Sequence, residues 1–136
     1  MEEKPFTLTE NFEENIQAIA SCFARNETLI QRRMENRWTP SLRFCLFYTD
    51  GMVNNKLVNE DIIRPILEYR FGRREDSIPD ILATRVVFTD GVEQTTDPDA
   101  ILSGILYGDC VVLTEGFAQA LVVNSKGCAT RALAEP

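Results

Sequence analysis

The sequence contains no histidine among its 136 residues. Histidine is the commonest general base near neutral pH and the commonest metal ligand in proteins. Its absence excludes Ser–His and Cys–His nucleophiles within this chain and removes the imidazole ligand of most zinc sites. Neither a Walker-type phosphate loop nor a G-x-G-x-x-G fingerprint is present. We therefore expect no enzymatic activity and no bound cofactor.

Long apolar runs are also missing. The most apolar stretch, residues 101–113, contains Asp109 and two glycines, whereas a bilayer-spanning helix needs roughly 20 predominantly apolar residues. The first five residues are acidic and lack the apolar segment of a secretory signal. With 44% hydrophobic and 26% charged residues, the chain can nevertheless bury a core of ordinary domain size. We expect residues 1–136 to form one soluble, cytosolic domain.

Positive charge is scarce in the second half of the chain. Residues 1–74 carry 11 basic and 11 acidic residues, whereas residues 75–136 carry 3 basic and 10 acidic residues, which accounts for the net charge of −7. Because nucleic-acid binding needs a basic face, this balance predicts no nucleic-acid partner. The acidic half serves solubility or meets a basic partner surface.

One basic and aromatic segment departs from this trend. Arg70 lies between Tyr69 and Phe71, and two further arginines follow at positions 73 and 74. Basic residues interleaved with aromatic residues occur in nucleic-acid sites. Three arginines in an acidic chain instead favour a solvated loop or an internal ion pair.

The four cysteines have no C-x-x-C spacing, which zinc knuckles and redox motifs require. Three of them lie in apolar runs, where a free cysteine behaves as a small hydrophobic residue. We expect no metal site and predict buried, reduced thiols at Cys22, Cys45, Cys110 and Cys128.

The N-terminal region predicts an amphipathic helix. Thr7 and Glu10 fit a capping box, with Thr7 as the N-cap. Apolar residues then recur at the spacing of one helix face, at Phe12, Ile16, Ile19 and Phe23. The helix is expected to end near Arg25. Such a face packs on the domain's own core or serves as a docking helix.

Two strands are predicted next. Residues 29–34 form a short strand, and residues 41–48 form a nearly continuous apolar and aromatic strand that ends at Asp50 and Gly51. The second pattern is typical of a central strand that is buried on both faces. The two strands can pair in antiparallel or parallel fashion.

The middle of the chain predicts two helices and a hairpin. Asn59 is expected to cap a helix that is kinked or restarted at Pro65 and that stops near Gly72. A short helix opens at Ser77 or Pro79 and runs to residue 84. Residues 86–88 and 92–95 are then expected to pair as strands across a tight Asp-Gly turn.

The C-terminal third predicts one helix and three strands. Asp97 and Pro98 are a strong helix start, and the helix stops at Gly108. Strands follow at residues 110–114, 117–123 and 128–133, with Arg131 on one face of the last. The predicted fold class is α/β (α+β). It has a mixed central sheet of five to six strands, four flanking helices and a C-terminal antiparallel meander.

Three stretches together resemble one family. The first is residues 47–53 followed by residues 59–67. The second is residues 108–113 with the Glu-Gly turn at 115–116 and the strand at 120–123, and the third is Arg131 with Glu135 and Pro136. Their order and spacing, across residues 10–136, are similar to the N-terminal region of the A subunits of GerA-type spore germinant receptors, the GerA/SpoVAF family.

The resemblance implies a function. A subunits of this family sit in the spore inner membrane, with a cytosolic N-terminal region, and work with B and C subunits and further A subunits. The chain would be the first α/β subdomain of such a membrane-embedded protein, acting in receptor assembly and in coupling the signal to ion release. The alternative is a small-ligand module that binds an amino acid, suggested by the family's likeness to substrate-binding proteins. The resemblance supplies no catalytic residues.

The structural or interface candidates lie mainly in turns and caps of the three resembling stretches. These candidates are Asp50, Gly51, Asn59, Gly108, Asp109, Arg131 and Glu135.

Overall fold

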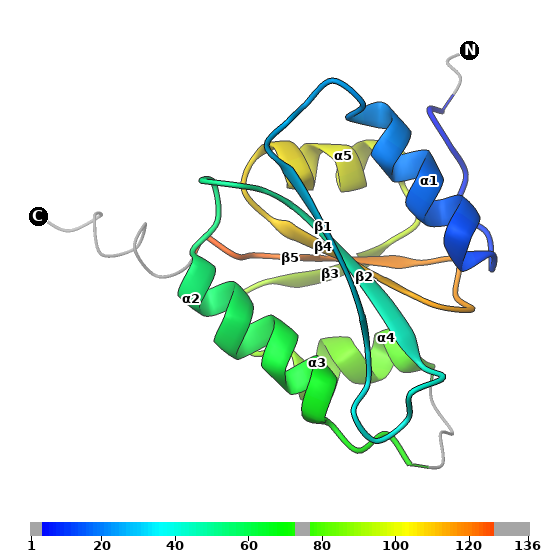
Figure 1. The fold of residues 1–136 in the computed structure, drawn as a ribbon, viewed down its shortest axis with the longest axis vertical. Helices are drawn as coiled ribbons and strands as arrows, with labels where there is room; N and C mark the ends of the chain where they lie inside the picture. Colours follow the sequence, from blue (N-terminus) through cyan, green and yellow to red (C-terminus); the bar gives the residue numbers. More distant parts are fainter. Residues whose placement is uncertain (1–3, 73–76, 127–136) are drawn as a thin grey trace, which may run out of the picture.

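The computed structural model describes residues 4–72 and 77–126. A five-stranded sheet in the order β1-β2-β4-β5-β3 forms its middle layer. Helices α1 and α5 cover one face, and α2, α3 and α4 cover the other (Figure 1). The α+β class, with five strands and four helical segments in the described part of the chain, is confirmed.

The described sheet is antiparallel throughout, rather than mixed as predicted. The strands are β1 (Leu29–Glu35), β2 (Arg43–Thr49), β3 (Val92–Thr95), β4 (Cys110–Thr114) and β5 (Ala120–Val123). Both hairpins, β1–β2 and β4–β5, pair antiparallel, and so do β2 with β4 and β3 with β5. The helical excursion after β2 leads to the far edge of the sheet, so no parallel β-α-β unit forms. The third strand of the predicted meander lies outside the described residues.

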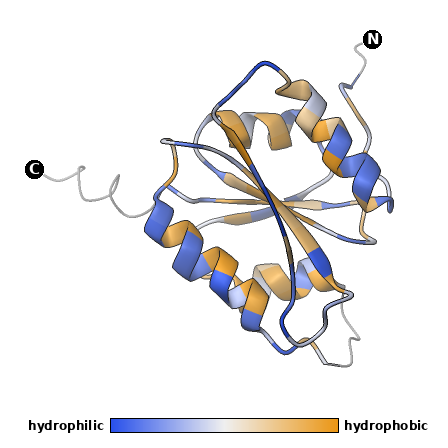
Figure 2. Cartoon of the chain, in the orientation of Figure 1, coloured by the Kyte–Doolittle hydropathy of each residue, from blue (hydrophilic) through white to orange (hydrophobic). Residues whose placement is uncertain are grey.

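The central strand β2 is buried on both faces, as its apolar run predicts. Phe44, Leu46 and Tyr48 pack beneath α3 and α4. Cys45 and Phe47 point to the opposite face, beneath α1 and α5. Because side chains alternate along a strand, one apolar run supplies both cores. Figure 2 shows this hydrophobic strand between the two helical layers, in which α1 and the α2–α3 segment carry both hydrophilic and hydrophobic bands.

Helix α1 (Phe12–Cys22) forms where the periodicity predicts it, but its cap differs. Asn11, not Thr7, is the N-cap, because the Asn11 side chain accepts the backbone N–H of Glu14 at 3.1 Å. The preceding segment turns back instead, since the buried Asn15 side chain exchanges two hydrogen bonds with the backbone of Thr9. The capping-box prediction is therefore wrong by one helical turn.

The second helical segment is continuous from α2 (Asn55–Leu57) through a π-helical stretch, η1 (Val58–Ile63), to α3 (Arg64–Glu68). Asn54 is the N-cap, since its side chain accepts the N–H of Leu57, so the predicted cap at Asn59 is wrong. Asn59 is an exposed residue inside η1. Pro65 stands at the predicted restart. It lacks the N–H that would donate to the backbone carbonyl of Asp61. The N–H of Phe88 donates to that carbonyl instead, at 3.1 Å.

The third helical segment begins after Ser77, as predicted, with α4 (Ile78–Ile81) and a π-helical end, η2 (Leu82–Val86). The strand predicted at residues 86–88 is wrong, because Val86 ends this helix, and Val87 is buried against the core and pairs with no strand in the described part of the chain. The predicted hairpin therefore does not form, and β3 pairs with β5. Helix α5 (Pro98–Leu106) starts at the predicted Asp97 cap.

Candidate functional site

Several predicted site residues meet at one end of the sheet. There β2 ends at Thr49, α5 ends at Leu106 and β5 ends at Val123. We call this end the junction and define it as residues 49–54, 106–109 and 125–126. Figure 1 shows these segments gathered on the left side of the molecule. Four of the seven predicted candidates lie here: Asp50, Gly51, Gly108 and Asp109.

The Asp-Gly turn sets the first side of the junction. Asp50 donates its backbone N–H to the carbonyl of Thr28 at 2.7 Å, which ties the turn to the segment before β1. Gly51 follows with a φ of +87°, a left-handed conformation that glycine adopts without strain. The Met52 N–H then donates to the carbonyl of Thr49 at 3.0 Å, which closes the turn. The turn residues therefore reverse the chain at the point where β2 ends.

The end of α5 is fixed by close approach as well as by conformation. Gly108 has a φ of +98°, and a Cβ added there would lie 2.9 Å from the backbone carbonyl oxygen of Met52. The hydroxyl of Thr49 donates to the carbonyl of Ile105 at 2.9 Å. The Asp109 N–H donates to the carbonyl of Gly104 at 2.8 Å. Glycine at position 108 thus lets two distant segments touch through their backbones.

The segment after β5 locks the other two together. The buried Ser125 hydroxyl donates to the carbonyl of Gly108 at 2.8 Å, while the Ser125 carbonyl accepts the N–H of Asn54 at 2.8 Å. The Lys126 ammonium pairs with the Asp109 carboxylate at 2.5 Å. Asp109 therefore acts in a partly buried ion pair, which neutralises one acid of the acidic half.

Of the remaining candidates, the structure describes only Asn59 and does not bring it to the junction. Asn59 lies in η1, beyond the Asn54 cap. Arg131 and Glu135 lie outside the described residues. Sequence patterns missed Ser125, Asn54 and Met52, because their roles depend on contacts between segments far apart in the chain.

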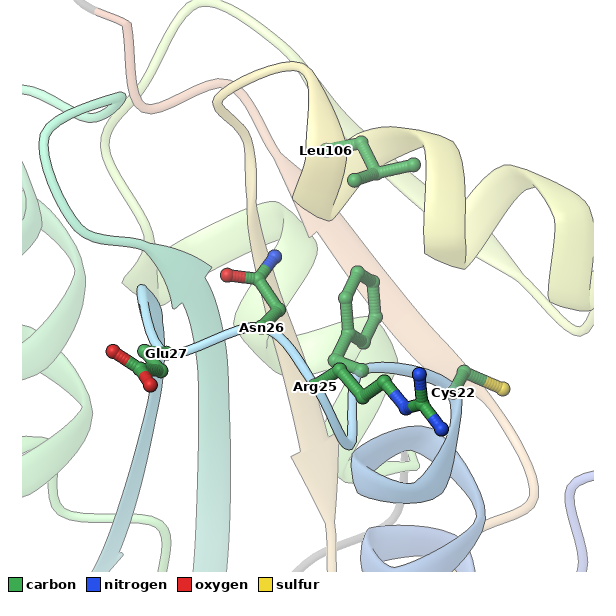
Figure 3. Close-up of a pocket in the computed structure, with 6 residues that line it drawn as sticks. Cys22, Arg25, Asn26, Glu27 and Leu106 are labelled. Carbon is green, nitrogen blue, oxygen red and sulfur yellow. The ribbon is translucent and has the colours of Figure 1, made fainter.

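The junction exposes apolar side chains and borders a hollow in the surface. Three exposed large hydrophobic side chains lie in the junction: Met52, Leu106 and Tyr107, with 47%, 49% and 69% of their surface exposed. Leu106 also lines a hollow of about 610 Å³. Figure 3 shows Leu106, on α5, across this hollow from Asn26 and Glu27 in the segment after α1. Exposed apolar side chains gathered at one end are typical of an interaction surface.

A second hollow, of about 310 Å³, lies beside Phe12, Arg33 and Arg43. Arg33 holds Glu13 through two hydrogen bonds of 2.7 and 2.9 Å, and this contact lowers the pKa of Glu13. Arg43 holds Glu115 in the same way, at 3.0 and 2.6 Å. A small carboxylate ligand would have to displace one of these glutamates. The hollow therefore presents no ready carboxylate site.

The described cysteines are free thiols that differ in solvent exposure. Cys45 and Cys110 are fully buried, and burial raises the pKa of Cys45 to about 12 and that of Cys110 further. Cys22, by contrast, is exposed beside the hollow at Leu106, so the prediction of a buried thiol is wrong there. Its pKa is also raised by partial desolvation. Cys22 lies on the exposed side of an amphipathic helix.

This difference predicts the order of thiol modification. Under native conditions Cys22 is expected to react with iodoacetamide at least about 100-fold faster than Cys45 or Cys110, because only the accessible thiolate reacts. Peptide mass spectrometry after timed labelling measures each site separately. In urea all three should react at similar rates. Equal labelling of Cys22 and Cys45 in the folded chain would contradict the described core.

Within residues 4–72 and 77–126, no three histidine, cysteine, aspartate or glutamate side chains gather closely enough to hold a metal ion. In the same ranges no helix has the length and apolar character needed to cross a bilayer.

The fold and the junction define the chain as a three-layer α+β domain whose loops are locked together at one end. The chain matches the model of the Bacillus/Clostridium GerA spore germination protein family over residues 17–136. It therefore belongs to this family, which confirms the resemblance drawn from the three stretches.

Relatives agree with this assignment. The chain is 32% identical to spore germination protein B1 of Bacillus subtilis (strain 168) over 92 residues, covering 68% of this chain and 19% of that protein. It is 21% identical to spore germination protein KA of the same organism over 134 residues, covering 98% of this chain and 24% of that protein. The chain thus spans about a fifth to a quarter of the length of these relatives.

A solved structure has the same fold. It is the N-terminal domain of the A subunit of the Bacillus megaterium spore germinant receptor GerK3, with a TM-score of 0.62 and 19% sequence identity. The match covers 90% of this chain and 96% of that domain. At this identity the likeness establishes the fold.

Proposed function

We propose that this chain is the cytosolic N-terminal domain of a spore germinant receptor A subunit at the spore inner membrane. In this role it helps to assemble the receptor with B and C subunits and further A subunits, and it couples the germinant signal to ion release. The domain acts through its surfaces, without catalysis. Family membership and the fold shared with the GerK3 domain support the proposal.

The observation that carries the proposal is the junction. Its backbone is rigid because hydrogen bonds join its three segments. Two of these hydrogen bonds are made by Ser125. Its surface nevertheless exposes the large side chains of Leu106 and Tyr107, which the fold does not bury in its core. A rigid scaffold that displays large apolar side chains loses little entropy on binding. These properties suit a surface that transmits a subunit contact.

The test uses the full-length A subunit in spores. Replacing Leu106 and Tyr107 together by glutamine is expected to slow germinant-triggered ion release by about tenfold, because central apolar side chains dominate most interfaces. Both residues are exposed, so the domain stays folded, with a change in stability within about 0.5 kcal/mol each. Ion release from a spore suspension after germinant addition measures the effect.

The matched control is Phe88→Gln. Phe88 is 66% exposed but lies beside η1, where its N–H binds Asp61. We expect this variant to release ions at the wild-type rate. Normal release from the Leu106 and Tyr107 variant, at a normal level of A subunit, would show that the junction surface is not used.

A further inference from the structure

The basic and aromatic segment around Arg70 forms a second surface, at the opposite end of β2 from the junction. Trp38, in the loop between β1 and β2, has 47% of its surface exposed. The Arg70 guanidinium carbon lies 3.7 Å from the centre of the Trp38 ring, and that of Arg37 lies 5.6 Å from it. We call these three residues, Arg37, Trp38 and Arg70, the Trp38 platform. The seven residues of β2 separate it from the junction by roughly 20 Å.

Hydrogen bonds to the end of α3 and to a buried asparagine hold the platform rigidly in place. The Trp38 indole N–H donates to the carbonyl of Glu68 at 3.0 Å, and the Trp38 backbone N–H donates to the Asn36 side chain at 3.0 Å. The same Asn36 side chain donates to the carbonyl of Tyr69 at 2.9 Å, next to Arg70. Phe71, on the other side of Arg70, is buried against Phe44. One buried amide therefore fixes the loop and the end of α3 relative to each other.

Stacking leaves the binding edge of Arg70 open. A guanidinium that lies over an aromatic ring uses its face for the contact, while its N–H groups point outward in its plane. Among the described residues, no carboxylate forms an ion pair with Arg70, whereas Arg37 has Glu68 at 3.7 Å. Arg70 thus presents a pre-oriented fork of donors, which matches a carboxylate in bidentate geometry. The exposed Trp38 ring beside it supplies apolar contact area.

We propose that the Trp38 platform binds an acidic segment of a partner protein, with a partner carboxylate on Arg70 and an aliphatic stem against Trp38. Tryptophan and arginine, together with tyrosine, are enriched in interface hot spots. The platform carries two arginines on a chain whose net charge is −7, so it offers complementary charge to an acidic partner that most of the chain does not. The same net charge disfavours a nucleic acid, which would contact a much wider face. The site is independent of the junction.

A titration of the chain tests the proposal, with a capped tetraglutamate peptide as the probe and capped tetraglutamine as the neutral control. Trp38 is the single tryptophan of the sequence, so its indole NMR signal reports on the platform alone. We expect a saturable shift with tetraglutamate that weakens as salt rises, and no shift with tetraglutamine. Arg70→Gln should weaken binding about tenfold or more. Arg70→Lys should weaken it too, because lysine lacks the planar fork.

The matched control is Arg25→Gln, since Arg25 is an exposed arginine beside the hollow at Leu106. This variant should bind tetraglutamate as the wild type does. Equal affinity of the Arg70→Gln and wild-type chains would overturn the proposal, and so would the absence of any Trp38 shift. A Trp38 shift with phosphatidylglycerol vesicles but not with tetraglutamate would also overturn it, in favour of a membrane-surface site.

Discussion

Replacing Asn36 with alanine is expected to lower the free energy of unfolding by about 4 kcal/mol, because each buried polar group left without a partner costs about 1–3 kcal/mol. Asn36 is fully buried. Its side chain contacts five backbone groups: the carbonyls of Ile66, Leu67 and Tyr69 and the N–H groups of Trp38 and Thr39. Alanine removes every one of these contacts and leaves a small cavity. Urea unfolding followed by circular dichroism measures the loss.

Asn15→Ala is the matched control. Asn15 is also buried, at 2% exposure, but among the described residues its side chain makes only the two hydrogen bonds with the backbone of Thr9. We expect a loss of about 2 kcal/mol. If Asn36→Ala costs no more than Asn15→Ala, the Asn36 contacts do not hold the β1–β2 loop to α3.

Replacing Gly108 with alanine is expected to lower the free energy of unfolding by about 3 kcal/mol. Roughly 1–2 kcal/mol comes from the left-handed backbone conformation. The rest comes from the new Cβ, which would lie 2.9 Å from the Met52 carbonyl oxygen, a backbone atom that cannot rotate away. Because the contact holds the junction together, relief requires the turn after β2 to move. Thermal unfolding of the variant measures the total cost.

Gly116→Ala separates the two causes. Gly116 has a similar φ of +89°, but an added Cβ there meets no atom of the described residues within 4 Å. This variant should lose only the conformational part, about 1–2 kcal/mol. Equal losses at both positions would mean that the contact between Gly108 and Met52 contributes nothing.

Local patterns predicted the parts of the fold that local forces decide. The apolar face of α1 follows a spacing of three and four residues, and the burial of β2 on both faces follows from its unbroken apolar run. The start of α5 at Asp97 was predicted because a capping carboxylate before proline leaves few alternatives. These elements form for reasons contained within about ten residues.

Tertiary contacts decided the elements that were predicted wrongly. Val86 and Val87 have strand-forming side chains, but the core beneath the sheet buries them at the end of a helix. Asn54 and Asn59 are equally good caps by residue type. The cap forms at Asn54 because its N–H is held by Ser125, 71 positions along the chain, where α2 leaves the junction. Neither outcome can be inferred from neighbouring residues.

The candidate site shows the same division. Turn chemistry identified Asp50, Gly51 and Gly108, since a left-handed backbone requires glycine at the latter two positions. Ser125 was missed, because a serine after a strand carries no signal that its hydroxyl will reach the end of α5. The exposure of Met52 and Tyr107 likewise depends on what the rest of the fold leaves uncovered.

The proposed role in receptor assembly can be measured most directly by co-purification of receptor subunits from spore membranes. A tagged full-length A subunit is compared in three forms: wild type, Leu106→Gln with Tyr107→Gln, and Phe88→Gln. We expect the wild-type and Phe88→Gln subunits to recover the B and C subunits equally. The junction variant should recover about tenfold less of at least one of them. Undiminished recovery of both subunits by the junction variant would contradict the assembly role.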